Sequence, residues 1–245
     1  MDDTPNLAVV VGVAGGVGGA LARTLAAQGR YDAVVGIARR RPDDWPDDPA
    51  RPFLTADITD EAQVADAARG IEGLGRPVRI VVATGLLHGE GVSPEKNLRM
   101  LDPEALMTLF RVNAVGPALI AKHLLPLTPR DRVSVFAALS ARVGSISDNR
   151  LGGWYGYRAS KAALNMLIAT LAIEQRRSRP QGVCVALHPG TVETRLSEPF
   201  GQGASTAPAR LTPTASAKAL VAVMDGLVPD DSGRFLAWDG RPIDW

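Results

Sequence analysis

The 245-residue sequence predicts an α/β fold in which helices cover both faces of a doubly wound parallel sheet. Short apolar runs alternate with longer helical patterns along the whole chain. The first run, residues 7–13, shows no polar alternation, which is typical of a strand buried on both faces of a parallel sheet. No internal repeat and no dividing linker interrupts the pattern, so we expect one domain over residues 1–245.

The composition limits the kinds of partner. A 46% share of hydrophobic residues suffices for a sizeable core, and the formal net charge of +1 comes without a dominant basic patch. Nucleic acid is therefore not the expected partner, and small molecules are. No apolar run approaches the roughly 18 residues that a membrane span needs, so we expect a cytoplasmic protein without a membrane segment.

Three further kinds of site are not expected. The single cysteine, Cys184, cannot form a disulfide within the chain. The histidines His88, His123 and His188 are far apart and lack partners at metal-ligand spacing, so we expect no metal site. The commonest serine-hydrolase motif, Gly-x-Ser-x-Gly, is missing. We therefore expect the chemistry to depend on a bound cofactor.

A glycine-rich turn, Gly12-Val13-Ala14-Gly15-Gly16-Val17-Gly18, follows the first predicted strand and leads into a helical pattern over residues 20–29. Strand, glycine turn and helix in this order form a phosphate site, because backbone N–H groups and the positive helix end meet a pyrophosphate that only glycine lets approach closely. A tight turn without a ligand is the alternative. We expect cofactor contacts at Gly12, Ala14, Gly15, Gly16, Val17 and Gly18.

The second predicted strand, residues 32–38, ends in Arg39-Arg40-Arg41. In a dinucleotide-binding fold this strand end meets the adenosine ribose, where an acidic residue would bind the 2'-hydroxyl and an arginine the 2'-phosphate. The acidic residue is missing here. Arg39 therefore favours NADP(H), with NAD(H) as the alternative cofactor. A solvated basic loop, neutralised by the aspartates within residues 43–48, is the competing interpretation.

The middle of the chain continues the alternation. We expect a strand at residues 53–56, a helix that Thr59 or Asp60 caps and that reaches Gly70, and a strand at residues 78–83. Asp102-Pro103 then starts a helix that runs to about residue 125. His88 lies in a glycine-bearing loop, where a histidine is more often a surface or substrate-contact residue than a base.

The last part of the chain supplies the remaining elements. A strand at residues 133–139 delivers Ser140 at its C-terminal end, the edge where open α/β sheets bind ligands. A long helix over residues 155–179 precedes a strand at residues 183–187, a helix at residues 215–227 and a short strand near Phe235. The irregular stretch at about residues 195–214 is expected to form a lid over the substrate.

Tyr157 and Lys161 open the long helix. Their i and i+4 spacing places the phenol and the ammonium on one helical face. A positive charge within about 4 to 6 Å favours the phenolate and lowers the pKa of the tyrosine, so that Tyr157 could exchange protons near neutral pH. The alternative is an aromatic residue and a charge on a half-exposed helix.

In combination these motifs resemble the short-chain dehydrogenase/reductase family over essentially the whole chain, which implies a single Rossmann-type domain. The features come in the family's order: the glycine turn, Asp57 after the third strand, Asn113, Ser140, Tyr157-x-x-x-Lys161 and Pro189-Gly190. Within the family, the segments that begin at Ser140 and Gly152 and the Asp239-Gly240 ending look like the C-factor branch of signalling-associated reductases.

The resemblance implies a catalytic set of Asn113, Ser140, Tyr157 and Lys161. Tyr157 would donate the proton, Lys161 would lower its pKa and hold the nicotinamide ribose, and Ser140 would bind the substrate oxygen. Hydride would move between nicotinamide and a carbonyl or alcohol carbon. Further implied cofactor contacts are Asp57, Ile58, Ala83, Thr84, Gly85, Pro189, Gly190, Val192 and Thr194.

One position and one segment depart from the family's pattern. Val11 stands where a threonine is usual, and Val82-Ala83-Thr84-Gly85 replaces an Asn-Asn-Ala-Gly segment. The side-chain amides that tie neighbouring strands in the family are therefore absent. We expect cofactor binding to survive on the glycine backbone and local rigidity to be reduced.

Pro117 lies inside the helix that carries Asn113. Because proline has no N–H, the Asn113 carbonyl loses its donor and we expect a kink. A water is the natural replacement donor in a polar cavity, and the resemblance implies that it links the Asn113 carbonyl to Lys161. The alternative is that Pro117 only bends a packing helix.

The substrate is expected to be a partly apolar carbonyl or alcohol, because Leu86, Leu87, Val143 and Trp154 lie in the segments around the predicted site. The resemblance also implies a homodimer or homotetramer built on the two long helices. A second functional hypothesis is a cofactor-binding signalling or sensing protein with slow or no turnover.

Overall fold

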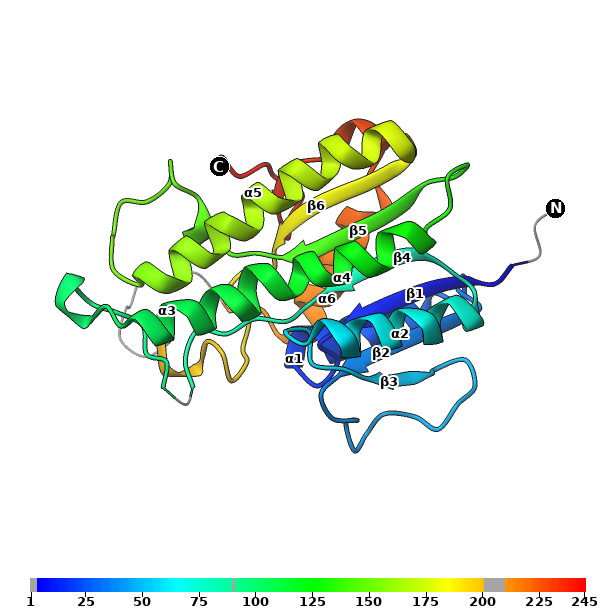
Figure 1. Cartoon of the computed structure of the whole chain (residues 1–245), viewed down its shortest axis with the longest axis horizontal. Coiled ribbons are helices and arrows are strands. Elements are labelled where there is room, and N and C mark those ends of the chain that lie inside the picture. Colours follow the sequence, from blue (N-terminus) through cyan, green and yellow to red (C-terminus); the bar gives the residue numbers. More distant parts are fainter. Residues whose placement is uncertain (1–3, 90, 201–209) are drawn as a thin grey trace.

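The computed structural model describes residues 4–89, 91–200 and 210–245. Within these residues the strands form one seven-stranded sheet in the order β3-β2-β1-β4-β5-β6-β7, and every neighbouring pair is parallel (Figure 1). The bounds are β1 Asn6–Val11, β2 Ala33–Ala38, β3 Phe53–Thr55, β4 Arg76–Val82, β5 Ser134–Leu139, β6 Gly182–His188 and β7 Phe235–Ala237. The predicted doubly wound parallel sheet is confirmed.

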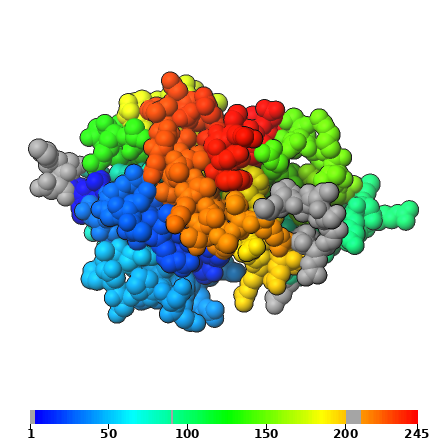
Figure 2. All heavy atoms as spheres, turned by 180° about the vertical axis from the view of Figure 1, so that it is seen from behind, coloured from blue at the N-terminus to red at the C-terminus, as the bar shows by residue number. Residues whose placement is uncertain are grey.

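Helices cover both faces of this sheet. On one face lie α2 (Glu61–Leu74), α4 (Gly116–Leu124) and α5 (Tyr155–Ser178), and on the other α1 (Gly16–Ala27) and α6 (Pro213–Asp225). Figure 2 shows the second face, with α6 in orange beside the blue segments near the N-terminus. Val9 packs under the first layer and Val10 under the second, so β1 is buried on both sides, as its apolar run predicts.

The helix expected at residues 103–125 is interrupted. It consists of α3 (Pro103–Phe110), a π-helical turn over Arg111–Val115 and α4. In the π turn the Gly116 N–H donates to the Arg111 carbonyl, five residues back. Pro117 has no N–H and its ring crowds the carbonyl four residues earlier, so the regular bond pattern cannot continue through this turn. Pro117 thus breaks the helix where a kink is expected.

Two helices begin earlier than expected. The α1 helix starts at Gly16 rather than near residue 20, because the last glycines of the turn form its first turn. The α6 helix starts at Pro213 behind the N-cap Thr212, whose hydroxyl accepts from the Ala215 N–H. Asp60, one of the two expected caps, caps α2. Part of the predicted lid, residues 201–209, lies outside the described residues, and the lid stays a prediction.

One helical stretch, Pro103–Leu127, is long and apolar enough by composition to cross a membrane, which the sequence analysis does not expect. It contains the π turn, and Leu109, Ile120 and Leu124 on its inner side are buried. Its α4 part packs against α2, α5 and β4. These contacts are those of a core helix that flanks a sheet.

Candidate active site

A cavity of about 2300 Å³ opens at the C-terminal ends of β1, β2, β4, β5 and β6. It includes the topological switch point between β1 and β4, where doubly wound sheets bind ligands. Except for Gly18 and Asn113, every residue that the sequence analysis places in the site lines it: Gly12, Ala14, Gly15, Gly16, Val17, Arg39, Asp57, Ile58, Ala83, Thr84, Gly85, Ser140, Tyr157, Lys161, Pro189, Gly190, Val192 and Thr194.

Gly18 serves packing instead. A Cβ atom at Gly18 would lie 2.2 Å from the Gly12 carbonyl oxygen, so only glycine lets α1 approach the strand end this closely. Gly12 itself has a φ of +93°, in the region that favours glycine. The prediction that Gly18 touches the cofactor directly therefore finds no support in the cavity lining, although the turn depends on it.

The start of α1 offers a site for an anion. Its N-cap residue is Gly15, no described side chain caps the first turn, and that turn holds no acidic residue. The first N–H groups of a helix have no intrahelical partner, and the helix end is positive. Nearby, the Thr84 hydroxyl is buried and has no hydrogen-bond partner among the described residues. Uncapped N–H groups and an orphaned hydroxyl in one cavity fit a dinucleotide.

The end of β2 presents free arginines. Arg39 and Arg40 are exposed and line the cavity. Arg41 instead donates to the Pro46 carbonyl at 3.0 Å and lies 3.5 Å from the Asp47 carboxylate. The loop acids therefore neutralise Arg41, as the competing interpretation expects, but within the described part of the chain no ion pair engages Arg39.

Three polar side chains of the predicted catalytic set line this one cavity: Tyr157, Lys161 and Ser140. Tyr157 lies in the first turn of α5 and is 6% exposed, and the Lys161 Nζ lies 5.9 Å from its ring centre. Lys161 Nζ donates to the Leu139 carbonyl at 2.8 Å. Ser140 follows β5, and its Oγ donates to Asn165 Oδ1 at 2.6 Å. The i and i+4 spacing thus brings Tyr157 and Lys161 together inside the molecule rather than on a half-exposed face.

Burial shifts the pKa values of Tyr157 and Lys161 in opposite directions. It raises the pKa of the Tyr157 phenol above its ordinary value and lowers the pKa of Lys161 to about 7. The expected lowering of the tyrosine pKa by Lys161 is therefore not seen. The reason is that desolvation disfavours both charged forms, while the Lys161 ammonium is directed to the Leu139 carbonyl.

Asn113 lies behind the cavity wall and is fully buried. Its Oδ1 accepts from the Leu86 N–H and its Nδ2 donates to the Leu86 carbonyl, both at 2.8 Å. The same Nδ2 donates to Ser160 Oγ at 3.0 Å. One amide therefore ties the loop after β4 to α5 and supplies rigidity that the sequence analysis expects to be lost there. The water link between the Asn113 carbonyl and Lys161 stays a prediction.

A family model described as short chain dehydrogenase matches residues 6–204. The chain belongs to this family. As a short-chain dehydrogenase it is an oxidoreductase, and the family uses nicotinamide cofactors.

Two curated relatives of this short-chain dehydrogenase stand out. C-signal of Myxococcus xanthus is 36% identical over 137 residues, which span 56% of this chain and 76% of that protein. A 1-hydroxy-2-glutathionyl-2-methyl-3-butene dehydrogenase of Rhodococcus sp. strain AD45 is 31% identical over 189 residues, 77% of this chain and 78% of its own. A Burkholderia multivorans protein solved with bound NADP has a TM-score of 0.80 and 27% identity, covering 99% of this chain and 100% of its own.

Sequence reasoning missed three residues that support the dehydrogenase site. Asn165 lies four residues after Lys161 on the same helical face, and its Nδ2 contacts the Gly144 carbonyl at 3.4 Å while its Oδ1 holds Ser140. The i+4 spacing from Lys161 was a signal that could have found it.

Glu95 is the second missed residue. It is 3% exposed, and its carboxylate accepts from the Gly156 N–H at 3.1 and 3.2 Å in the first turn of α5. The Glu95 carbonyl also accepts from the N–H of the N-cap residue Trp154, whose φ is +52° and which provides no side-chain cap. No local pattern could predict this cap, because Glu95 lies far upstream in the sequence.

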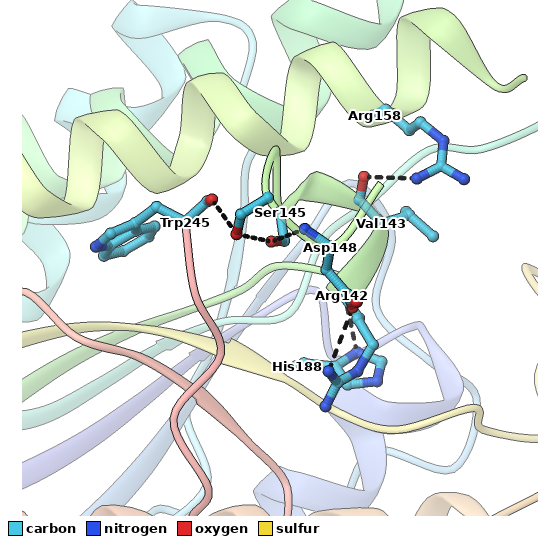
Figure 3. Close-up of polar contacts among 8 residues, drawn as sticks. Arg142, Val143, Ser145, Asp148, Arg158, His188 and Trp245 are labelled. Atoms are coloured by element: carbon cyan, nitrogen blue, oxygen red, sulfur yellow. Dashed lines mark hydrogen bonds and ion pairs between the residues drawn. The ribbon is translucent and has the colours of Figure 1, made fainter. Parts of the chain in front are cut away.

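His188 is the third. It ends β6 and lines the cavity, and its Nδ1 is 3.4 Å from the Arg142 N–H (Figure 3). Burial and the nearby Arg142 charge lower the pKa of His188 to about 4, so it is neutral at pH 7. Arg158 supports the same rim, since its guanidinium donates to the Val143 carbonyl at 3.2 Å.

Proposed function

We propose that the chain is an NADP(H)-preferring carbonyl reductase or alcohol dehydrogenase in which Tyr157 is the acid/base. The observation that carries this proposal is one cavity that Tyr157, Ser140 and Lys161 share with the uncapped start of α1. The Burkholderia protein with bound NADP and the Rhodococcus dehydrogenase of an alcohol support the cofactor and the reaction class.

Each residue then has a proposed role. When bound, the nicotinamide supplies or accepts the hydride. Tyr157 donates a proton to the carbonyl oxygen in reduction and removes it in oxidation. Lys161, buried beside Tyr157, holds the nicotinamide ribose. In its charged form it also favours the phenolate of Tyr157. Ser140 binds the substrate oxygen. Its Oγ donates to Asn165 Oδ1 in the structure, so it can accept from the hydroxyl of an alcohol, and it must turn away from Asn165 to donate to a carbonyl oxygen.

The proposed cofactor contacts follow the cavity from end to end. The turn at residues 12–18 binds the pyrophosphate, and Arg39 binds the 2'-phosphate of the adenosine ribose. Asp57 and Ile58 lie at the adenine end. The remaining contacts are assigned to the ribose and nicotinamide end: Ala83, Thr84, Gly85, Pro189, Gly190, Val192 and Thr194.

A second candidate function is a cofactor-binding signalling or sensing protein with slow or no turnover. The similarity to C-signal of Myxococcus xanthus favours it. The two functions differ in what Tyr157 does, since only an enzyme needs its proton.

NADPH oxidation measured against a panel of aldehydes and ketones tests the proposal. The unmodified protein should reduce at least one class of carbonyl, and Tyr157→Phe should lower kcat at least about a hundredfold while NADPH still binds. Unchanged turnover in Tyr157→Phe would contradict the role of the phenol. NADPH binding without reduction of any carbonyl would favour the second candidate.

We also propose a cytoplasmic homodimer or homotetramer that acts on a small, partly apolar molecule. The four apolar residues expected near the substrate, Leu86, Leu87, Val143 and Trp154, all line the cavity. Sedimentation and fractionation of cells that produce the protein test the assembly and the location.

A further inference from the structure

The part of the cavity formed by the segments after β4, β5 and β6 is rich in basic residues. Its wall comes from the loop after β4, from residues 141–158 after β5, and from residues 191–197 with residue 210 after β6. Five arginines line this part: Arg142, Arg150, Arg158, Arg195 and Arg210. Asp148 is the one carboxylate among the described residues that line it, since the other acidic lining residue, Asp57, comes after β3.

Two of these arginines hold the wall together. Arg142 lies 3.4 Å from the Asp148 carboxylate. Arg158 donates to the carbonyls of Gly153, Val143 and Gly152 at 3.0, 3.2 and 3.1 Å, which fastens the rim to α5. The Arg158 guanidinium thus holds three loop carbonyls in place. In the described chain it has no carboxylate within hydrogen-bond distance.

The other three, Arg150, Arg195 and Arg210, have no ion pair with any described carboxylate. Arg210 Nη2 donates a hydrogen bond to the Ser197 carbonyl at 3.0 Å. Because this carbonyl is neutral, the bond leaves the Arg210 charge uncompensated. His88 Nε2 lies 3.0 Å from the Arg195 carbonyl, so the loop after β4 and the segment after β6 meet in this part of the cavity. Arg150 and Arg195 are exposed and Arg210 is half-buried. A cavity rim lined by one sign of charge raises the local concentration of ligands of the opposite sign.

An apolar wall lies next to Tyr157, and one of its residues, Leu196, is the sequence neighbour of Arg195. Leu87 is 4% exposed and belongs to one cluster with Tyr157, and Leu86, Val143, Trp154 and Leu196 pack against this cluster. A ligand with its carbonyl at Tyr157 would therefore place apolar atoms here and its far end among the arginines.

We propose that the substrate carries an anionic group, a carboxylate or a phosphate, at the end remote from the reacting carbonyl. Arg195 and Arg210 bind this group with Arg150. Guanidinium groups match both anions because two parallel N–H groups can meet two oxygens. The inference rests on the proposed reductase function, and it assigns the substrate class that the function leaves open.

The inference is tested with three aldehydes of similar size: 4-formylbenzoate, 4-formylphenyl phosphate and methyl 4-formylbenzoate. The kcat/KM with NADPH should be at least about tenfold higher for one of the two anions than for the neutral ester, and this ratio should fall on addition of 0.3 M salt. The two anionic aldehydes distinguish a carboxylate from a phosphate. An ester that reacts as well as both anions would overturn the inference.

Substitutions of Arg195 and Arg210 test whether these residues bind the anionic group of the substrate. The anion-to-ester ratio should fall about tenfold in the double variant Arg195→Gln/Arg210→Gln, and Arg195→Lys/Arg210→Lys should retain part of it. The matched control Arg176→Gln changes an exposed arginine near the C-terminal end of α5 and should leave the ratio unchanged. An unchanged ratio in the double glutamine variant would overturn the assignment.

A competing role for Arg195 is contact with the cofactor, because it follows Thr194, whose side chain lies close to the glycine turn. A Cβ at Gly16 in that turn would lie 3.0 Å from the Thr194 side chain. The Kd for NADPH, measured by fluorescence, should be equal in the unmodified protein and in Arg195→Gln. Weaker NADPH binding with an unchanged anion-to-ester ratio would overturn the role of Arg195.

Binding separates this inference from the proposed function. If no aldehyde is reduced, the reductase function fails, and calorimetry on the protein loaded with NADP⁺ still decides the ligand class. Tighter binding of 4-(hydroxymethyl)benzoate than of its methyl ester would support an anionic ligand. Equal binding of the two would overturn it.

Discussion

At the scale of single residues, burial governs the chemistry of Lys161. Lys161 is 2% exposed, and the hydrogen-bond acceptor of its ammonium among the described residues is the neutral Leu139 carbonyl. Removing a charge from water without a carboxylate partner favours the neutral form, so the pKa of Lys161 falls to about 7 from its ordinary 10.5. A negatively charged group in the cavity would raise the pKa of Lys161 again, because it favours the ammonium form.

This pKa predicts how stability depends on pH. Between about pH 7 and pH 10.5 the unfolded chain binds a proton at Lys161 that the folded chain does not bind, so the free energy of unfolding rises with pH. The rise should be visible from pH 7 to 8.5, below the range in which the raised pKa values of Cys184 and Tyr157 act in the opposite sense. Urea unfolding should show the slope in the unmodified protein and a flatter curve in Lys161→Met. Parallel curves would contradict the prediction.

A second residue-scale prediction concerns Arg39. The preceding Ala38 removes the acid that would repel a 2'-phosphate, and the Arg39 guanidinium lines the cavity without an ion pair among the described residues. Losing a charged hydrogen bond costs about 1.5 to 3 kcal/mol, so Arg39→Ala should weaken NADPH binding roughly ten- to a hundredfold and leave NADH binding unchanged.

Fluorescence titration with both cofactors measures this effect. Arg41→Ala is the matched control, because Arg41 is turned toward Pro46 and Asp47. Equal affinity for NADPH and NADH in the unmodified protein would count against the prediction.

At the scale of elements, α5 depends on a cap from a distant part of the chain. The N-cap Trp154 has left-handed backbone angles and no capping side chain, and the Glu95 carboxylate accepts from the Gly156 N–H in its place. A Cβ at Gly156 would lie 2.6 Å from the Leu109 side chain and 2.9 Å from the Glu95 carboxylate, so a larger residue would displace one of these side chains. Glu95 thus sets the first turn of α5, the turn that carries Tyr157.

Glu95→Ala should therefore destabilise the fold by about 1 to 2 kcal/mol, the usual cost of losing a cap. It should also lower kcat and leave the KM for NADPH nearly unchanged. The reason is that the first turn of α5 positions Tyr157, whereas the proposed NADPH contacts in the glycine turn of α1 do not depend on this cap. Urea unfolding and steady-state kinetics measure the two effects. Glu174→Ala, an exposed change on the same helix, is the control. Glu95→Ala with unchanged stability would rule out the cap.

The elements that sequence could predict are those whose signals are local. Periodicity and glycine or proline positions locate the strands and helices to within a few residues, and Pro117 marks the break before α4. The π turn itself was not predicted, because a missing N–H shows where a helix must change but not which bond replaces the lost one.

The candidate site also combines features that have a local sequence signal with features that do not. The i and i+4 pair and the glycine turn are local patterns, so their meeting in one cavity was expected. The bonds of Glu95 to Gly156 and of Asn113 to Leu86 join segments far apart in sequence, and they follow only from tertiary packing. The sign of the Tyr157 pKa shift depends on burial, which the spacing of Tyr157 and Lys161 does not reveal.

At the scale of the whole molecule, the outer surface of α3, the π turn and α5 exposes large apolar side chains. Met107 and Val115 are 54% and 46% exposed, and Met166 and Ile173 are 68% and 64% exposed. Met166 and Ile173 are seven residues apart and share one face of α5, and α3 packs beside α5. Exposed apolar side chains on neighbouring helices are typical of a protein interface, and a two-fold axis beside α5 would bury those of α5 in an isologous contact.

We therefore expect a homodimer or homotetramer at micromolar concentration, held together by these helices. The double variant Met166→Glu/Ile173→Glu would place four carboxylates in each two-fold contact, since each variant protomer brings two. Their desolvation should weaken assembly at least about a hundredfold, enough to yield the 25.8 kDa monomer. Sedimentation measures the change, and Leu74→Glu on α2, which is away from this surface, should not alter it. A 25.8 kDa species alone in the unmodified protein at ten micromolar would contradict the prediction.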